Sequence, residues 1–363
     1  MAILGLASDL PDMRARLGRI VIGRDGSGKD VTAEDLQCAG AMAAILRDAI
    51  DPTVMQTTEK TLAFVHTGPF ANIAHGNSSI LADRVASRCA DYVVTEGGFG
   101  ADMGAEKFFN IKCRASGMRP DAAVLVVTIR ALKSHSGHFP LRQGRPLPDE
   151  LFQENLEAVG EGCENLEAQI ANVRAHGVPV VVAVNRFPTD SDAELELVCE
   201  RAMAAGAEAA EISEVHGRGG EGGEALAAAV IRVAESDAAD FRFLYPSEMP
   251  LAEKIEILAL RLYGAGSVEF SAEAREELSA LQEAGHGHLP ICMAKTQYSL
   301  SHDPQFKGRP HGFVFPVRGV RLAAGAGFVV AFAGNIMTMP GLGRTPAYRG
   351  VDLDAEGQIQ GLF

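Results

Sequence analysis

The stretch VPVVVAVNRFPTD, residues 178–190, is apolar almost without interruption until Val184 and then turns polar. A continuous apolar run bounded by turn residues is typical of a strand buried on both faces, as in a parallel sheet covered by helices. Four other runs have the same texture: RIVIG (19–23), LAFVHTG (62–68), DYVVTEG (91–97) and AAVLVVTIR (122–130). We therefore expect these five runs to form a mostly parallel sheet.

Amphipathic segments alternate with these runs. Thr32, with Asp35 three residues later, resembles the capping box that begins many helices. The expected helices cover residues 32–50, 78–90, 151–177 and 192–207. Alternation of strands and helices indicates an α/β fold with right-handed crossovers.

The alternation of strand-like and helical segments ends near residue 245. Two helical segments, 253–266 and 271–287, precede the strand-like segments 288–301 and 312–334. We expect an α/β core domain over residues 1–168, a second, smaller α/β domain over 169–244 and an α+β C-terminal lobe over 245–363. The Pro-rich segment HFPLRQGRPLPDE (138–150) is interpreted as a surface loop.

Composition limits the class of protein. The chain has 363 residues and a net charge of −14, so the protein as a whole is not expected to bind nucleic acid or an anionic membrane. Six scattered cysteines without a C-x-x-C pair argue against a zinc site or a disulfide framework. No signal peptide is recognisable, and no apolar run reaches the ~18–20 residues of a membrane span. These features predict a cytoplasmic protein without a metal site.

The octapeptide GRDGSGKD (23–30) matches part of the ATP-binding P-loop pattern. Gly23, Gly28 and Lys29 have the right spacing, but Asp30 stands where a Ser or Thr would hold Mg²⁺. Asp and Gly at these positions are also strong turn formers. We expect a hairpin turn here rather than a phosphate loop.

Polar segments follow four of the expected strands. They are HTGPFANIAHGNSS (66–79), TEGGFGADMGAEKFFNIKCR (95–114), TIRALKSHSG (128–137) and VNRFPTD (184–190). Because ligands of α/β sheets collect at the carboxyl ends of the strands, these segments together predict a binding site.

The same segments carry a resemblance to a known family. The motifs are PFANIAHG (69–76), DYVVTEGGFGADMGAEKFFNIKCR (91–114), VNRFPTD (184–190), GGEGG (219–223), MAKTQYS (293–299), RPHGF (309–313), IMTMPGL (336–342) and the final GLF. In this order they resemble formate–tetrahydrofolate ligase, also called formyltetrahydrofolate synthetase. Members of that family are longer at the N-terminus, where their P-loop lies. The resemblance therefore implies a core like that of P-loop NTPases, but without its P-loop.

The resemblance also implies a folate slot. Phe187 matches one wall against which the pterin stacks, and Pro188 and Ile212 flank it. His216 takes the position of the opposite wall, where the family usually has Trp. Phe99 is assigned to the same slot. An imidazole can stack, but with less area than an indole.

Five polar residues in the matching segments are candidates for catalysis: Asn72, His75, Glu96, Asp102 and Lys107. Cleavage of an N-formyl group needs a general base for water and a donor for the oxyanion. His75 or Asp102 is a candidate base, and Lys107 or Asn72 a candidate donor. A structural ion pair of Lys107 with a neighbouring glutamate is the alternative interpretation.

Three functions remain open from the sequence. The first is an ATP-independent hydrolase that releases formate and tetrahydrofolate from 10-formyltetrahydrofolate, requiring no cofactor, ATP or Mg²⁺. The second is part of an ATP-dependent formate–tetrahydrofolate ligase that a separate P-loop polypeptide completes. The third is a non-catalytic folate-binding protein. A folate is the expected small-molecule ligand in each case, and the resemblance implies a homo-oligomer.

Overall fold

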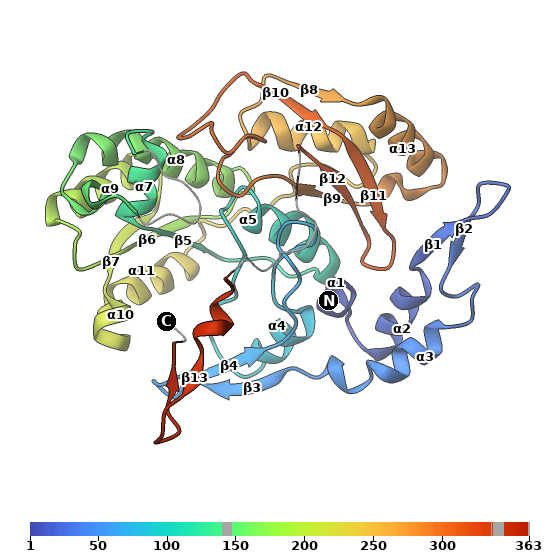
Figure 1. Cartoon of the computed structure of the whole chain (residues 1–363), viewed down its shortest axis with the longest axis horizontal. Coiled ribbons are helices and arrows are strands. Elements are labelled where there is room, and N and C mark those ends of the chain that lie inside the picture. Colours follow the sequence, from blue (N-terminus) through green and yellow to red (C-terminus); the bar gives the residue numbers. More distant parts are fainter. Residues whose placement is uncertain (140–146, 335, 337–344, 362–363) are drawn as a thin grey trace.

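A computed structural model describes residues 1–139, 147–334, 336 and 345–361 of the chain. It contains a three-stranded parallel sheet in the order β5–β6–β7, on the left of Figure 1. The strands are β5 (Ala123–Val127), β6 (Val180–Asn185) and β7 (Ala209–Ser213). This arrangement confirms the predicted α/β class.

Helices cover both faces of this sheet. Along β6, Val180, Val182 and Val184 belong to the core under the helices of one face. Val181, which points the other way, packs with α11. The helices of the first face are α7 (Ile129–His135), α8 (Leu156–Arg174) and α9 (Asp192–Ala204), and α11 spans Glu224–Ala234. The alternation of strand side chains thus explains why both faces of β6 are apolar.

The C-terminal lobe has its own core. Its elements up to β12 are drawn in orange and red-brown at the top of Figure 1, whereas the last described segment, in red with β13, lies at the bottom of that view. Its elements are α12 (Leu251–Arg261), α13 (Ala272–Glu283), the sheet β11 (Gly319–Ala323)–β12 (Phe328–Phe332)–β9 (Ile291–Ala294), and the pair β10 (Val314–Val317)–β8 (Ser267–Phe270). The helices and strands expected in this part of the sequence are therefore confirmed.

The N-terminal third is built from short elements. The helices are α1 (Ala2–Leu6), α2 (Leu10–Gly18), α3 (Ala39–Ile45), α4 (Ile80–Ala86), α5 (Gly104–Lys107) and α6 (Arg114–Ser116), with a π-helix over Phe108–Cys113. The strands are β1 (Val21–Arg24), β2 (Asp30–Thr32), β3 (Thr53–Gln56) and β4 (Leu62–Val65). Later short elements are α10 (Val215–Arg218), β13 (Asp352–Leu353) and β14 (Ile359–Gln360).

The parallel sheet is smaller than the sequence predicts. The runs at 19–23 and 62–68 form strands of the antiparallel hairpins β1–β2 and β3–β4, so the prediction that they join the parallel sheet is wrong. The run 91–97 forms only one bridge, between Asn77 and Gly97. Apolar residues of these runs stay exposed, as at Ile22 and Val94. An apolar run alone does not distinguish a local hairpin partner from a distant parallel one.

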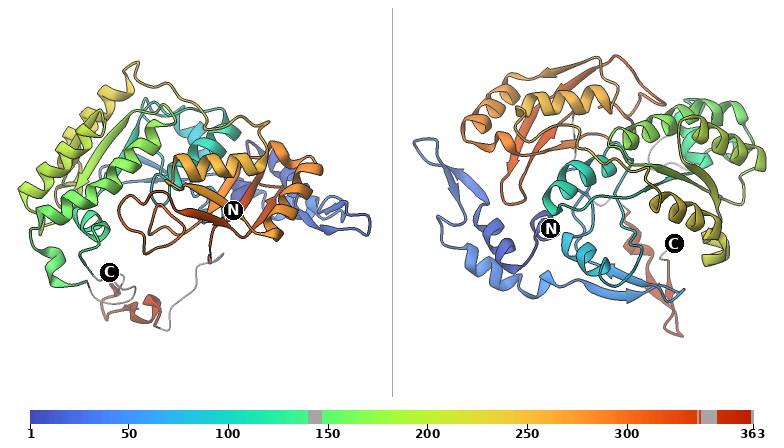
Figure 2. Two further views of the ribbon diagram at one scale, coloured as in Figure 1. Left: turned by 90° about the horizontal axis from the view of Figure 1, so that it is seen from above. Right: turned by 180° about the vertical axis from the view of Figure 1, so that it is seen from behind.

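The GRDGSGKD segment is the turn of the β1–β2 hairpin, as predicted. The Asp25 carboxylate accepts the backbone N–H of Ser27 at 2.8 Å and that of Lys29 at 3.0 Å. Gly28 has a φ of +85°, which other residues rarely adopt. The turn projects outward (Figure 2, right), although the Asp30 carboxylate in β2 lies 3.1 Å from the His286 ring of the C-terminal lobe. A β-strand follows the turn where a phosphate loop needs a helix.

The predicted cap at Thr32 forms, but it does not begin a helix there. The Thr32 N–H and the Asp35 N–H are each bonded to the other residue's side chain, at 2.8 and 3.3 Å. Gln37 then has a φ of +57°, which interrupts the helical path. Helix α3 consequently begins only at Ala39.

The predicted domain boundaries stay predictions; the first of them falls within helix α8. Parts of three predicted features lie outside the described residues. They are residues 140–146 of the loop 138–150, residues 337–342 of IMTMPGL, and residues 362–363 of GLF. Among the helices of the described residues, none combines the length and the apolar character needed to cross a membrane.

Candidate functional site

Four of the five predicted slot residues lie at or just beyond the carboxyl ends of the neighbouring strands β6 and β7. Ile212 of β7 pairs with Val184 of β6, so Phe187 and Pro188 leave the sheet directly beside it. His216 follows in α10 and is exposed, as is Pro188, while Phe187 and Ile212 are half-buried. Four of the five predicted slot residues thus come from one edge of the sheet.

The turn that carries Phe187 is held by its own hydrogen bonds. The Phe187 N–H donates to the Asp190 carboxylate at 2.8 Å, and the Asp190 N–H donates to the Phe187 carbonyl at 3.0 Å. Burial raises the pKa of Asp190. Ser191 and Glu194 form a capping box that begins α9 immediately afterwards. The turn therefore positions Phe187 through a backbone fixed on both sides.

Arg130 is a neighbour of the slot that the sequence did not single out. Its guanidinium carbon lies 3.7 Å from the centre of the Phe187 ring and 5.7 Å from that of Phe152. The segment TIRALKSHSG is a polar strand end, but nothing in its pattern distinguishes Arg130 from its neighbours. The ring that Arg130 contacts, Phe187, comes from another strand end.

Phe99 lies in a different environment from the other four slot residues. It has a φ of +66°, which is strained for a residue with a side chain. Its ring meets that of Phe70 edge-on at 6.3 Å between centres, and the side chain is 43% exposed. Its place in the slot remains a prediction.

Lys107 is fully buried and holds the loop that contains Asn72. Its ammonium donates to the Ala71 carbonyl at 2.6 Å and to the Asn72 carbonyl at 2.8 Å. Glu106, one of the predicted ion-pair partners, instead accepts a hydrogen bond from Asn110 at 3.0 Å. Burial raises the pKa of Glu106 to about 7. Lys107 therefore fixes the backbone of the 69–76 motif.

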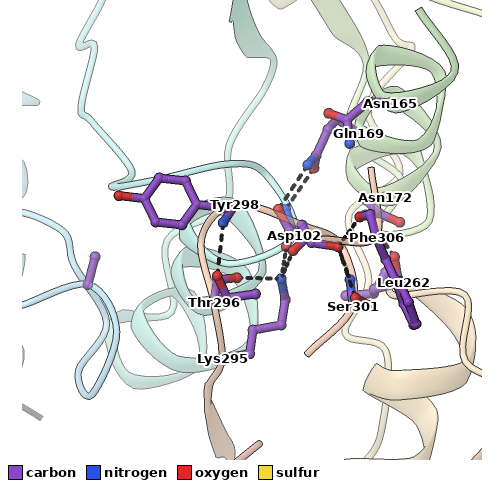
Figure 3. A network of polar contacts seen from close by, with 12 residues as sticks. Asp102, Asn165, Gln169, Asn172, Leu262, Lys295, Thr296, Tyr298, Ser301 and Phe306 are labelled. Atoms are coloured by element: carbon purple, nitrogen blue, oxygen red, sulfur yellow. Dashed lines mark hydrogen bonds and ion pairs between the residues drawn. The ribbon is translucent and has the colours of Figure 1, made fainter. Parts of the chain in front are cut away.

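Asp102 lies at the centre of a buried polar network (Figure 3). Lys295, at the end of β9, is 2.6 Å from its carboxylate, and Gln169 of α8 donates to it at 2.9 Å. Lys295 also donates to the carbonyls of Thr296 and Ser299, and burial lowers its pKa. The network joins the C-terminal lobe to the core of the chain.

His75 is wholly buried, and within the described residues neither ring nitrogen has a hydrogen-bond partner. Burial, with help from the charges of Lys112 and Lys107, lowers its pKa to about 3, so the ring is neutral near pH 7. A Cβ on Gly5 would lie 2.9 Å from its Nε2, which shows how closely α1 covers it. Glu96, by contrast, is exposed, and its carbonyl accepts a hydrogen bond from Asn77.

The geometry thus separates two features. One is a group of exposed and half-buried residues at the ends of β6 and β7, where the folate slot is predicted, and the other is a closed polar cluster around Lys107, Asp102 and His75. No group of three or more His, Cys, Asp and Glu side chains is arranged to hold a metal ion in the part of the chain that the structure describes. Aromatic rings with convergent polar groups suit a flat organic ligand.

Comparison with known proteins agrees with the resemblance. The model of the family "Formate–tetrahydrofolate ligase" matches residues 1–363. The chain belongs to this family. It is 55% identical to the formate–tetrahydrofolate ligases of Chloroflexus aggregans, over 370 residues, and Saccharopolyspora erythraea, over 362 residues. The enzyme of Aeromonas hydrophila is 54% identical over 362 residues. All of this chain is matched, but only 65%, 64% and 63% of these relatives, respectively.

Membership in the formate–tetrahydrofolate ligase family corrects the first function expected from the sequence. An ATP-independent hydrolase is wrong, and so is the expectation that ATP has no part, because relatives this similar are named formate–tetrahydrofolate ligases and not hydrolases. The hydrolase was inferred from the missing phosphate loop. The relatives match this chain over only about 65% of their length, so a loop missing from the matched part says nothing about the reaction.

Proposed function

We propose that this chain carries the folate side of an ATP-dependent formate–tetrahydrofolate ligase. The observation that carries the proposal is the slot at the ends of β6 and β7, in a chain 55% identical throughout to such ligases. Phe187 offers a ring face to the pterin, and Pro188 and Ile212 supply apolar edges. His216 takes the opposite side. Flat aromatic ligands gain both apolar burial and stacking from such walls.

The five candidate catalytic residues divide into two roles under this proposal. Glu96 is exposed and available to a ligand. The remaining four are buried, and two of them make contacts that fix backbone or loop positions: Lys107 with the 69–76 loop and Asp102 with Lys295. We assign these buried residues to shaping the site. Rigid support of this kind is what keeps a binding geometry in place.

The rest of the ligase would pack against β5. The relatives are longer than this chain, and the resemblance places their P-loop in the additional part. Among the described residues β5 pairs on one side only, with β6, and Val124 and Val126 are 38% and 65% exposed. In native proteins, an edge strand with exposed apolar side chains is usually covered by another part of the structure. This supports completion by the remaining ligase segment, on the same polypeptide or another.

The proposal is tested by reconstitution. The chain is incubated with formate, tetrahydrofolate and ATP, alone and with the part of the Chloroflexus aggregans ligase that it lacks. We expect formyltetrahydrofolate only from the combined polypeptides, with a strong loss for Phe187→Ala. Lys29→Ala, in the exposed hairpin turn, serves as the control and should keep the full rate. No product from two folded, associated polypeptides would argue against the proposal.

A further inference from the structure

Arg130 contacts the rings of Phe187 and Phe152, and its charge also acts on Asp190 in the Phe187 turn. Its guanidinium lies over the face of Phe187, and the Phe152 ring is also within reach. Within the described residues it makes no ion pair or hydrogen bond. A guanidinium this close to a ring centre is a cation–π contact, which strengthens when the pair is partly withdrawn from water, as half-buried Arg130 and Phe187 are.

The start of helix α7 determines where Arg130 lies. The helix follows β5 directly, and the Thr128 hydroxyl caps it by accepting the Ala131 N–H at 3.1 Å. Arg130 is therefore in the first turn, at the carboxyl end of β5. Because β5, β6 and β7 are parallel, this is the same sheet edge from which Phe187 projects.

A buried ion pair keeps α7 and the Phe187 turn in register. Lys133, one turn after Arg130, lies 2.6 Å from Glu194 of α9, and both side chains are at most 2% exposed. Glu194 also closes the capping box with Ser191, the residue that ends the Phe187 turn. Arg130 and Phe187 are thus attached to one rigid support, which preorganises their contact.

We propose that Arg130 is a positioning residue for the folate ligand. Its guanidinium covers one face of the Phe187 ring and leaves the other face for the pterin. A ring that is already held loses less freedom when the ligand stacks on it. The planar guanidinium matters here, because a lysine ammonium carries the charge but does not stack. This inference rests on the proposed function, since that proposal makes Phe187 a wall of the slot.

The test uses the full 363-residue chain and tetrahydrofolate. The chain has no Trp, so the circular dichroism of the bound pterin is measured against a low protein background. Arg130→Ala and Arg130→Lys are each expected to weaken binding about fivefold to tenfold and to reduce the induced signal. Arg321→Ala is the matched control, because Arg321 lies over Phe332 in the C-terminal lobe at 5.5 Å. It should bind like the parent chain.

The outcomes separate this inference from the proposed function. Affinity equal to that of the parent in Arg130→Lys would overturn the stacking role, and this variant decides the matter if Arg130→Ala does not fold. Loss of binding in Phe187→Ala with parental binding in both Arg130 variants would remove the Arg130 inference alone. No binding by the parent, or parental binding by Phe187→Ala, would remove the folate slot and the inference with it.

Discussion

At the scale of single residues, the environment of Glu106 disfavours its charged form. The side chain is completely buried, and within the described residues its Oε2 has no hydrogen-bond partner. Burial raises its pKa from 4.5 to about 7, against the opposing effects of Asn110 and Lys107. The folded chain therefore holds a proton on Glu106 that the unfolded chain releases between these pH values. The contribution of the protonated Glu106 side chain to stability is complete below pH 4.5 and is lost as the pH rises to 7.

Glu106→Gln should remove this pH dependence. The amide keeps an oxygen for Asn110 and never ionises, so the stability of the variant relative to the parent should increase with pH. Relative to the parent, the unfolding free energy of the variant should be about 2 kcal/mol higher at pH 8 than at pH 5. Urea unfolding at the two pH values measures it. Glu276→Gln, at an exposed position of α13, should show no such change with pH.

At the scale of elements, the sequence predicted best what depends on local pattern. The strand 180–185 and the helices α8 and α9 follow from a continuous apolar run and from amphipathic segments with capping residues. The run 62–68, which forms β4, is expected in the parallel sheet but pairs with β3 in a hairpin, because its apolar pattern does not reveal its partner. The contacts of Arg130 with Phe187 and of Lys295 with Asp102 join residues far apart in the chain, and neither partner's local pattern reveals the other.

The Lys295–Asp102 pair fastens strand β9 to the loop before α5, so breaking it should loosen both elements. Asp102→Asn leaves the Lys295 ammonium buried without its carboxylate, and we expect a loss of about 3–5 kcal/mol in unfolding free energy. Adding Lys295→Met should recover part of this loss, because the stranded charge disappears. Denaturant unfolding of the two single variants and the double variant measures the coupling. Glu34→Gln, in the exposed pair with Arg14, should leave the midpoint unchanged.

At the scale of the whole molecule, one side of β5 has no strand partner among the described residues. The Ala123 N–H donates to the Pro179 carbonyl at 2.9 Å, toward β6. Alternate residues of a strand direct their backbone groups to opposite sides, so those of Val124 and Val126 face away from β6. Their side chains are exposed. Under the proposed function, a further ligase segment would add backbone hydrogen bonds at this edge and would cover the two valines.

Val126→Asp should affect assembly and leave the isolated chain nearly intact. Because Val126 is 65% exposed, we expect the substitution to change the unfolding free energy of the chain by no more than about 1 kcal/mol. The concentration of added ligase segment that gives half-maximal reconstituted activity should rise about tenfold or more. Val314→Asp is the control, since Val314 is 48% exposed on strand β10 of the other lobe. Equal titrations for the two variants would show that β5 is not the contact.

The same edge of β5 has a consequence for the chain when it is made alone. In the part of the chain that the structure describes, this edge of β5 has no strand partner, and two copies of the chain can pair through such an edge. We therefore expect self-association of the isolated chain to increase with its concentration, and to decrease when a segment that covers β5 is added.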